Sequence, residues 1–393
     1  MLQENIRALA RSFHSEVVDI RRHLHQHPEL SFEETQTAAF IAKKLYDWGI
    51  PFQSGVAGNG LVALIEGKNP NTEIRALRAD MDALPIQEAN AVSYRSQVPG
   101  VMHACGHDVH TASLLGTARI LQDLRDHWEG SVKLIFQPGE ERLPGGASQM
   151  IREGVLEDPA PSYILGQHVE PFMETGKVGF CSGPYMASAD EIYITLRGKG
   201  GHAAMPHQTV DTILMAAQLI NLLQQVISRN THPATPAVLS FGKIWSEGGA
   251  TNIIPDEVKL MGTFRTMDEN WRFQAHELIR RQCFHLCASM GGTAEVDIQV
   301  GYPPLYNDPE LTRQRRQLAV SYLGQDKVLD LPIRMTSEDF AFYSQQIPAS
   351  FYRLGTGNPD KGISSAVHTP TFDIDEESLY IGSGLMAWLA VGR

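Results

Sequence analysis

Cysteine is scarce in this sequence, which has four in 393 residues, at positions 105, 181, 283 and 287. So few and so unevenly spaced cysteines exclude the disulfide framework of small secreted proteins and predict free thiols. Cys283 and Cys287 lie four apart in a helical pattern, so we expect both to be buried. Cys105 differs, because it lies in a stretch rich in glycine and histidine.

Long apolar runs, dense basic stripes and nucleotide-binding motifs are also lacking. No stretch approaches the ~20 consecutive apolar residues of a membrane-spanning helix, and the charged, amphipathic N-terminus is unlike a signal peptide. A formal net charge of -12 disfavours nucleic acid and anionic lipid as partners. The glycine-rich stretches lack the P-loop and dinucleotide patterns, and no G-x-S-x-G elbow is present. We therefore expect a cytoplasmic protein that binds neither nucleic acid nor a membrane.

The chain is long enough for two domains, since single cores seldom grow past ~250 to 300 residues. In residues 1–187 short apolar runs alternate with helical patterns, which predicts an α/β domain with a largely parallel sheet. One of these helices is expected to begin at Ser31 as its cap, with Glu34 three residues on. Residues 188–301 follow a β-α-β-β-α-β order, which is typical of an inserted ferredoxin-like domain. Residues 302–393 are expected to complete the first domain.

Polar residues follow three of the expected strands at the point where each strand ends. Asp80 and Asp82 come after "IRAL", Glu140 and Glu141 after "VKLIF", and His168 after "YIL". Ligands of open α/β sheets bind at the edge where the strands end. These residues are therefore candidates for a single cleft.

The stretch "MHACGHDVH" holds the densest group of metal-ligand residue types. Cys105 and His107 could face one ion, since Gly106 between them permits a close approach. The string is too short for a structural zinc finger, and a histidine-rich loop without a ligand stays open. A cysteine nucleophile paired with His107 or His110 also stays open, although it would leave the acidic pair and His368 unexplained.

The "PGEE" turn strengthens the metal hypothesis. Adjacent carboxylates are unfavourable unless a positive charge lies between them or one is protonated. A metal would supply that charge, with Glu141 as a ligand and Glu140 left unbound to take a proton from an activated water. A solvated acidic turn is the plain alternative.

Two further histidines, His168 and His368, extend the set, although each alone is typical of an ordinary structural histidine. The candidate ligands are then one thiolate, three imidazoles and a carboxylate, namely Cys105, His107, Glu141, His168 and His368. This mixture suits zinc, manganese, cobalt or nickel better than calcium or magnesium. Five ligands exceed the needs of one tetrahedral ion, so we expect two ions that share a water.

Candidate substrate contacts lie in the expected insertion. His202 and His207 lie on a glycine-rich turn, and His202 could stabilise an oxyanion. Asn252 and Arg265 could bind a substrate carboxylate, the arginine through a bidentate fork. A glycine-rich loop without a chemical role is the alternative.

Seven motifs follow one another along the chain: "RRHLHQHPELSFEE", "RADMDALPIQE", "MHACGHDVHTA", "IFQPGEE", "GKGGHAAMPH", "TNIIPDEV" and "HTPTFDIDEE". In this order they resemble metal-dependent amidohydrolases that include hippurate hydrolase, N-acyl-L-amino acid amidohydrolase and the indole-acetyl-amino acid hydrolases. These enzymes belong to the aminoacylase and carboxypeptidase G-type metallopeptidase superfamily. The motifs extend over nearly the whole chain.

The resemblance implies a zinc-peptidase-like α/β catalytic domain interrupted by a lid domain, through which a homodimer or homotetramer would form. It implies two divalent ions, manganese or zinc first and cobalt or nickel as alternatives, held by the five ligands above with Glu140 as base. His202 matches a lid histidine that approaches the reacting carbonyl, from its own or a partner subunit. The superfamily's His-x-Asp ligand motif is replaced here by Asp80-Met81-Asp82, so neither aspartate is assigned as a ligand, and a supporting role for Asp82 stays open.

The activity that the resemblance implies is hydrolysis of the amide bond of a small N-acyl-L-amino acid, such as a hippurate-like, N-acetyl or indole-acetyl conjugate. A dipeptidase or carbamoyl-amino-acid hydrolase would use the same site. A metal-binding module without catalysis and a cytosolic thiol protein built on Cys105 are alternatives from other classes. The intact Glu140-Glu141 pair speaks against the binding module, because binding alone needs only the ligand glutamate.

Overall fold

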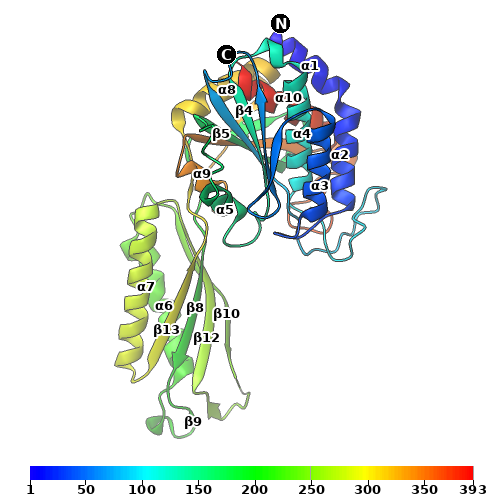
Figure 1. Ribbon diagram of the computed structural model, residues 1–393. Helices are drawn as coiled ribbons and strands as arrows, with labels where there is room; N and C mark the ends of the chain where they lie inside the picture. Colours follow the sequence, from blue (N-terminus) through cyan, green and yellow to red (C-terminus); the bar gives the residue numbers. More distant parts are fainter. Residues whose placement is uncertain (248, 393) are drawn as a thin grey trace. The chain divides into compact units, whose positions relative to one another are not determined.

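The computed structural model describes residues 1–247 and 249–392, and the chain divides into two compact units (Figure 1). The first, here the α/β unit, comprises Met1–Gly183, Tyr306–Pro332 and Asp339–Arg393. The second, here the inserted unit, comprises Pro184–Leu305 and the short segment Ile333–Glu338. No helix among the described residues is long and apolar enough to cross a membrane.

The α/β unit is built on an eight-stranded sheet with the order β1-β2-β4-β3-β5-β16-β6-β15. Its central neighbours β4, β3, β5 and β16 run parallel, whereas β1, β2 and β6 each join the sheet through an antiparallel pair. The strands are β1 (Phe52–Val56), β2 (Gly60–Glu66), β3 (Ile74–Asp80), β4 (Ser131–Gln137), β5 (Tyr163–Glu174), β6 (Val178–Phe180), β15 (Val328–Asp330) and β16 (Ala349–Gly357). Every residue of β4 and β16 is buried, as expected for strands covered on both faces. The predicted α/β class is confirmed.

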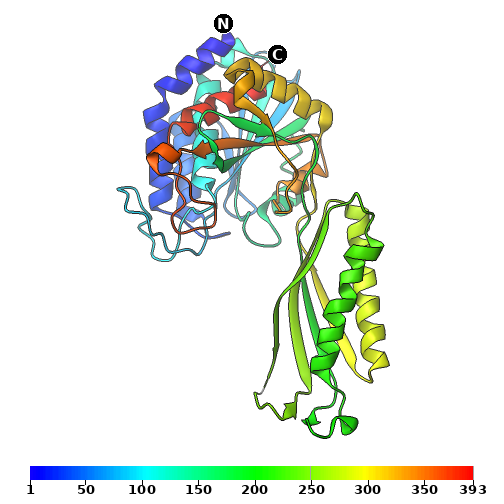
Figure 2. The ribbon, with the colours of Figure 1, turned by 180° about the vertical axis from the view of Figure 1, so that it is seen from behind.

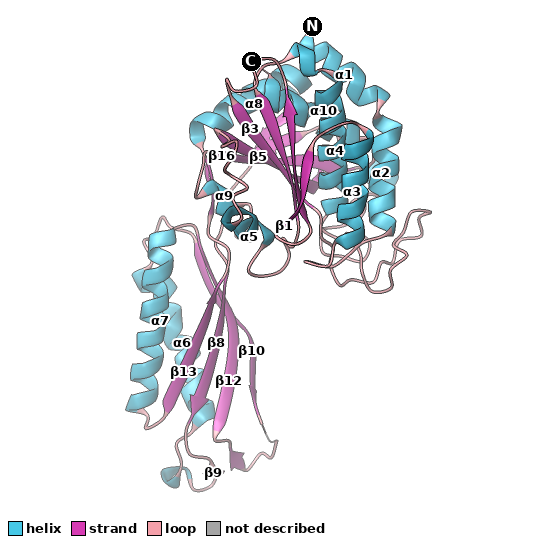
Figure 3. Ribbon diagram, in the orientation of Figure 1, coloured by secondary structure: helices cyan, strands magenta, loops and turns pink. Residues whose placement is uncertain are grey.

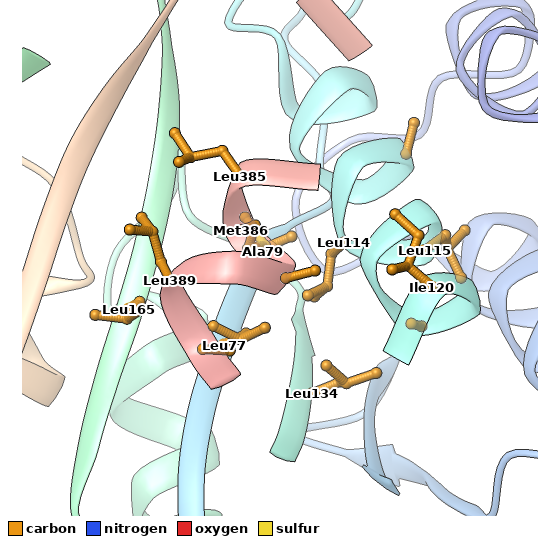
Figure 4. Close-up of a cluster of buried hydrophobic side chains, with 14 of the residues drawn as sticks. Leu77, Ala79, Leu114, Leu115, Ile120, Leu134, Leu165, Leu385, Met386 and Leu389 are labelled. Atoms are coloured by element: carbon orange, nitrogen blue, oxygen red, sulfur yellow. The ribbon is translucent and has the colours of Figure 1, made fainter. Parts of the chain in front are cut away.

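Helices cover this sheet (Figure 3). They are α1 (Leu2–Ser12), α2 (His14–Gln26), α3 (Thr35–Asp47), α4 (His107–Asp123), α5 (Gly146–Arg152), α8 (Pro309–Leu323), α9 (Ala341–Ser344) and α10 (Ser378–Val391). The helices α4 and α10 pack on each other and on the central strands, while α5 and α9 form a separate pair. Figure 4 shows the resulting core, in which Leu77 of β3, Leu114 of α4 and Leu385 of α10 meet. Both chain termini lie at the same end of this unit (Figure 2).

Two local predictions in the α/β unit are wrong. The helix α3 begins at Thr35 with Glu34 as its N-cap position, and Ser31 does not cap it. Ser31 instead donates a hydrogen bond to the distant Asp82, an interaction that local sequence spacing does not reveal. His168 lies inside the twelve-residue strand β5 rather than after its end, because β5 continues to Glu174 alongside β16.

The inserted unit has the predicted ferredoxin-like order. Its four strands pair antiparallel as β10-β12-β8-β13, with two helices between them in sequence. The elements are β8 (Asp190–Arg197), α6 (Thr212–Gln225), β10 (Ala237–Ser246), β12 (Glu257–Thr266), α7 (Glu269–Ser289) and β13 (Thr293–Val300). A second ribbon pairs β9 (Gly201–His202) with β11 (Ile253–Ile254), and β7 (Gly183–Met186) pairs with β14 (Leu305–Asn307). Alternate residues of β8 are buried, and Cys283 and Cys287 lie buried in this unit's core as predicted.

Candidate metal centre

The side chains of the five predicted ligands meet in the α/β unit. The Sγ atom of Cys105 lies 3.5 Å from His168 Nε2 and 3.3 Å from His368 Nε2. The Oε1 atom of Glu141 lies 3.2 Å from His368 Nε2 and 3.9 Å from His107 Nε2. Residues separated by up to 263 positions in sequence thus form one continuous cluster.

Two groups of possible ligand atoms in the cluster overlap at Cys105. Cys105 groups with His107 and His168, and it also groups with Glu141 and His368, all within 4.8 Å of one another in each group. The shared member is Cys105. Cys105, His107 and His168 could hold one divalent cation, and Cys105, Glu141 and His368 could hold a second.

Poorly paired polar atoms support the same interpretation. Among the described residues, the buried Nε2 atom of His107 has no hydrogen-bond partner, and the buried Oε1 atom of Glu141 has only the His368 ring, at 3.2 Å. Buried polar atoms are usually satisfied, so such a pair requires an explanation. A divalent cation between an imidazole lone pair and a carboxylate oxygen would supply it, so the residues fit a metal centre.

Hydrogen bonds behind the cluster orient the histidines. The Nδ1 atom of His107 lies 3.1 Å from Asp82 Oδ1, and the Nδ1 atom of His168 lies 2.8 Å from the carbonyl oxygen of Val169. Because these oxygens accept hydrogen bonds from Nδ1–H, each Nε2 atom keeps its lone pair toward the cluster. Asp82 also accepts the Glu141 backbone N–H at 2.9 Å. Asp82 therefore contacts two of the predicted ligand residues, His107 and Glu141, as a residue with a supporting role would.

A neighbouring network uses Asp80 and His110. His110 Nδ1 lies 2.6 Å from Asp80 Oδ1, and His110 Nε2 accepts the Val169 N–H at 2.9 Å. With both ring nitrogens engaged, His110 is not free to pair with Cys105 as a base. Burial opposes ionisation of Asp80, but the Arg78 guanidinium and the adjacent imidazoles hold the pKa of Asp80 well below its usual range.

The electrostatics of the cluster favour added positive charge. Burial, together with the Glu141 carboxylate, raises the pKa of the Cys105 thiol. The hydrogen bonds of His368 to Cys105 and Glu141 raise the pKa of that histidine to about 10. A thiol with a raised pKa is a poor nucleophile at neutral pH. The arrangement therefore disfavours the alternative of an independent cysteine nucleophile and suits a cation that stabilises the thiolate.

Glu140 lies beside the cluster. One carboxylate oxygen, Oε2, is 4.0 Å from His107 Nε2, and the other accepts the Asp339 backbone N–H at 3.3 Å. Its residue is 7% exposed. Glu140 lies outside both groups that share Cys105, although it also forms a group of possible ligand atoms with His107 and Glu141. A carboxylate held in this position is suited to proton transfer.

The candidate residues of the inserted unit are arranged differently. His202 and Asn252 are exposed and come together on the β9-β11 ribbon, where the Ala203 N–H donates to the Asn252 carbonyl oxygen at 2.9 Å. Arg265 lies near the far end of β12, and its Nη1 donates to the Met335 carbonyl oxygen at 3.0 Å. A strand rises ~3.4 Å per residue, so Arg265 lies far from the ribbon, which meets the other end of β12. His207 is exposed on a short turn.

Comparison with known proteins extends these observations. A protein-family model described as "Peptidase family M20/M25/M40" matches residues 76–391. An N-acetyl-L-cysteine deacetylase from Bacillus subtilis is 42% identical, covering 93% of this chain and 85% of that protein. An N-acyl-L-amino acid amidohydrolase from Geobacillus stearothermophilus is 42% identical, covering 79% and 83%. The crystal structure of a Bacillus subtilis protein, described as a dinuclear metal binding peptidase, is 35% identical with a TM-score of 0.83, covering 97% and 98%.

Proposed function

Because this chain belongs to peptidase family M20/M25/M40, we propose that it is a metal-dependent hydrolase that cleaves the amide bond of N-acyl-L-amino acids. The family match and these full-length relatives confirm the resemblance inferred from the seven motifs. The observation that carries the proposal is the cluster of five potential ligands, with Glu140 beside it and with the buried His107 Nε2 atom, which has no hydrogen-bond partner among the described residues. The products would be a free amino acid and a carboxylic acid.

In this proposal two divalent ions are held by Cys105, His107, Glu141, His168 and His368. When bound, they would lower the pKa of water and polarise the substrate carbonyl. Glu140 takes the proton of the attacking water and returns it to the leaving amine. The donor set favours zinc or manganese, with cobalt or nickel as alternatives.

The inserted unit is proposed to contact the substrate. In this scheme His202, from its own or a partner subunit, stabilises the oxyanion. Asn252 and Arg265 stay candidates for binding the carboxylate of the amino acid, but they lie too far apart in one chain to bind the same carboxylate together. We further propose catalytic segments 1–187 and 302–393, and a lid at 188–301 through which a dimer or tetramer forms. We also propose the cytoplasm as its compartment, which the charged, amphipathic N-terminus favours over a signal peptide and with which the free cysteines agree.

Metal removal and restoration test this proposal directly. We would strip the protein with a chelator, measure its metal content, and assay hippurate and N-acetyl-amino acids after adding zinc, manganese, cobalt or nickel. About two ions per chain, with metal-restored release of free amino acid, would support the proposal. Metal binding with cleavage of dipeptides or carbamoyl-amino acids instead would favour the runner-up activities. If the protein bound no metal, the proposal would be contradicted, and the alternative of a thiol protein built on Cys105 would be favoured.

A further inference from the structure

The loop between α2 and α3 contacts both acidic parts of the candidate centre. We call three of its residues, Ser31, Phe32 and Glu34, the SFEE clamp; this motif has no role in the proposed function. The Ser31 hydroxyl donates to Asp82 Oδ2 at 2.7 Å, and the same oxygen accepts the Glu141 N–H at 2.9 Å. The clamp thereby touches the carboxylate that orients His107.

Glu34 links this loop to the turn that carries the acidic pair. It is 0% exposed, and no salt bridge to it is found within the described parts of the chain. Its Oε1 atom accepts the Phe32 N–H at 2.9 Å and the Gly139 N–H at 2.8 Å. The Asn59 amide lies 3.3 Å from Oε2. A carboxylate buried without a cation is unfavourable, so these hydrogen bonds are what hold it in place.

Backbone geometry makes the contact specific to these residues. Phe32 has a φ of 68°, a left-handed conformation that is rare for a bulky side chain. Its ring lies against Gly139, where an added Cβ would come within 2.4 Å of a ring carbon. Gly139 itself has a φ of 62°. Strained residues persist where surrounding contacts fix them, which is frequent at functional sites.

We propose that Glu34 is a positioning residue for Glu140. By holding the Gly139 N–H and the Phe32 ring against Gly139, it fixes the turn from which the Glu140 and Glu141 side chains project. The inference rests on the proposed role of Glu140 as the base. Misplacement of a reacting group by ~1 Å can lower a rate ~100-fold, so the clamp has a direct kinetic consequence.

The test compares Glu34→Ala with Glu34→Gln and with Glu33→Ala, an exposed neighbour that serves as the control. We expect Glu34→Ala to lower kcat ~10- to 100-fold, with KM and metal content near those of the wild type. Glu34→Gln keeps an acceptor oxygen for Gly139 and should recover most of the rate. Glu33→Ala should match the wild type.

Amide hydrogen exchange provides a readout that does not depend on activity. In chelator-treated protein, Glu34→Ala should accelerate exchange at the Gly139 amide, while Glu34→Gln and Glu33→Ala should not. If the wild type cleaves no N-acyl amino acid, the proposed function fails, yet the exchange result still decides whether Glu34 holds the turn. Unchanged exchange or unchanged kcat in Glu34→Ala overturns the inference.

A purely structural role has its own signature. If kcat falls only in proportion to metal content or to the folded fraction, Glu34 is not a positioning residue. Should Glu34→Ala fail to fold, Asn59→Ala serves as the milder variant, because it removes the amide that donates to the Phe32 carbonyl oxygen at 3.1 Å. Asn59→Ala must then also lower kcat, by less than is expected for Glu34→Ala, and must accelerate exchange at the Gly139 amide.

Discussion

The two units of the chain hold most of their candidate site residues in different ways, with the exposed His368 and the half-buried Arg265 as exceptions. In the α/β unit, Cys105, His107 and His168 are at most 7% exposed, and the rings are fixed by hydrogen bonds from behind. In the inserted unit, His202 and Asn252 are exposed on a short ribbon, and the only ring contact of His202 there is the Ala204 N–H at 3.0 Å, within the described residues. The buried residues of the α/β unit are thus held in fixed positions. The exposed side chains on the ribbon of the inserted unit have few contacts that would restrict their movement.

The largest effect should come from the preorganised side. Glu140→Gln keeps the shape of the side chain but removes its basicity, so we expect kcat to fall ~10²- to 10⁴-fold with metal content unchanged. Metal analysis and steady-state kinetics check this. Glu66→Gln, at an exposed position at the end of β2, is the control and should leave both values unchanged. Retained turnover in Glu140→Gln would remove Glu140 from the role of base.

Cys105→Ala tests whether the shared thiolate is the centre of the cluster. Even residues that merely support metal ligands contribute ~10- to 100-fold to metal affinity, so loss of this thiolate should weaken binding by at least that factor. Titration of the chelated protein with zinc or manganese measures it. Cys287→Ala, in the core of the inserted unit, should bind metal like the wild type. Equal affinity in both variants would contradict the assignment of Cys105 as a ligand.

The inserted unit also has a buried charge network, which we expect to affect its stability rather than metal binding. Asp190 accepts hydrogen bonds from Arg272 and the Gly301 N–H and lies 2.7 Å from His276 Nε2. Removing one partner of a buried pair costs ~3 kcal/mol or more, so Asp190→Asn should lower the free energy of unfolding by about that amount near neutral pH. Asp297→Asn on the same sheet's edge strand β13, where Asp297 is exposed, is the control.

The pH dependence follows from the same network. Burial opposes ionisation, but the hydrogen bonds of Arg272 and His276 hold the pKa of Asp190 below its ordinary value. The stabilisation is therefore present above the unfolded-state pKa of ~3.9 and is lost as the pH falls through the lower folded-state value. Chemical denaturation from neutral to acidic pH should show the difference between wild type and Asp190→Asn shrinking. A constant difference would contradict this account.

The smallest effect is expected on the exposed ribbon. His202→Ala should lower kcat ~10- to 100-fold, at or below the range for a single oxyanion donor, without changing metal content or stability. His207→Ala, a neighbouring exposed histidine, is the control. If His202→Ala lost metal, the contrast between the two units would be wrong.

The sequence singles out five side chains that the structure brings together, because four of them, Cys105, His107, Glu141 and His168, belong to short motifs in the α/β pattern; their role as metal ligands stays a prediction. The α/β class and the ferredoxin-like order follow from alternating apolar patterns for the same reason. It does not predict the contacts of Ser31 and Glu34 with Asp82 and Gly139, because those depend on how separate loops meet in space. The same limit applies to His110, whose two ring nitrogens are engaged by Asp80 and Val169.

One feature of the α/β unit bears on the order of folding. The helix α10 is buried along its length except at the half-buried Tyr380, and it packs against α1 and α4. His368 of the cluster comes shortly before it in sequence. Both reach the ribosome exit only after the inserted unit has been made, whereas nearly all of the inserted unit is one continuous segment. Domains generally fold as units during synthesis, so the inserted unit should reach its native state while the α/β core still lacks its last helix. Metal binding at the cluster would then be among the last steps of synthesis and folding.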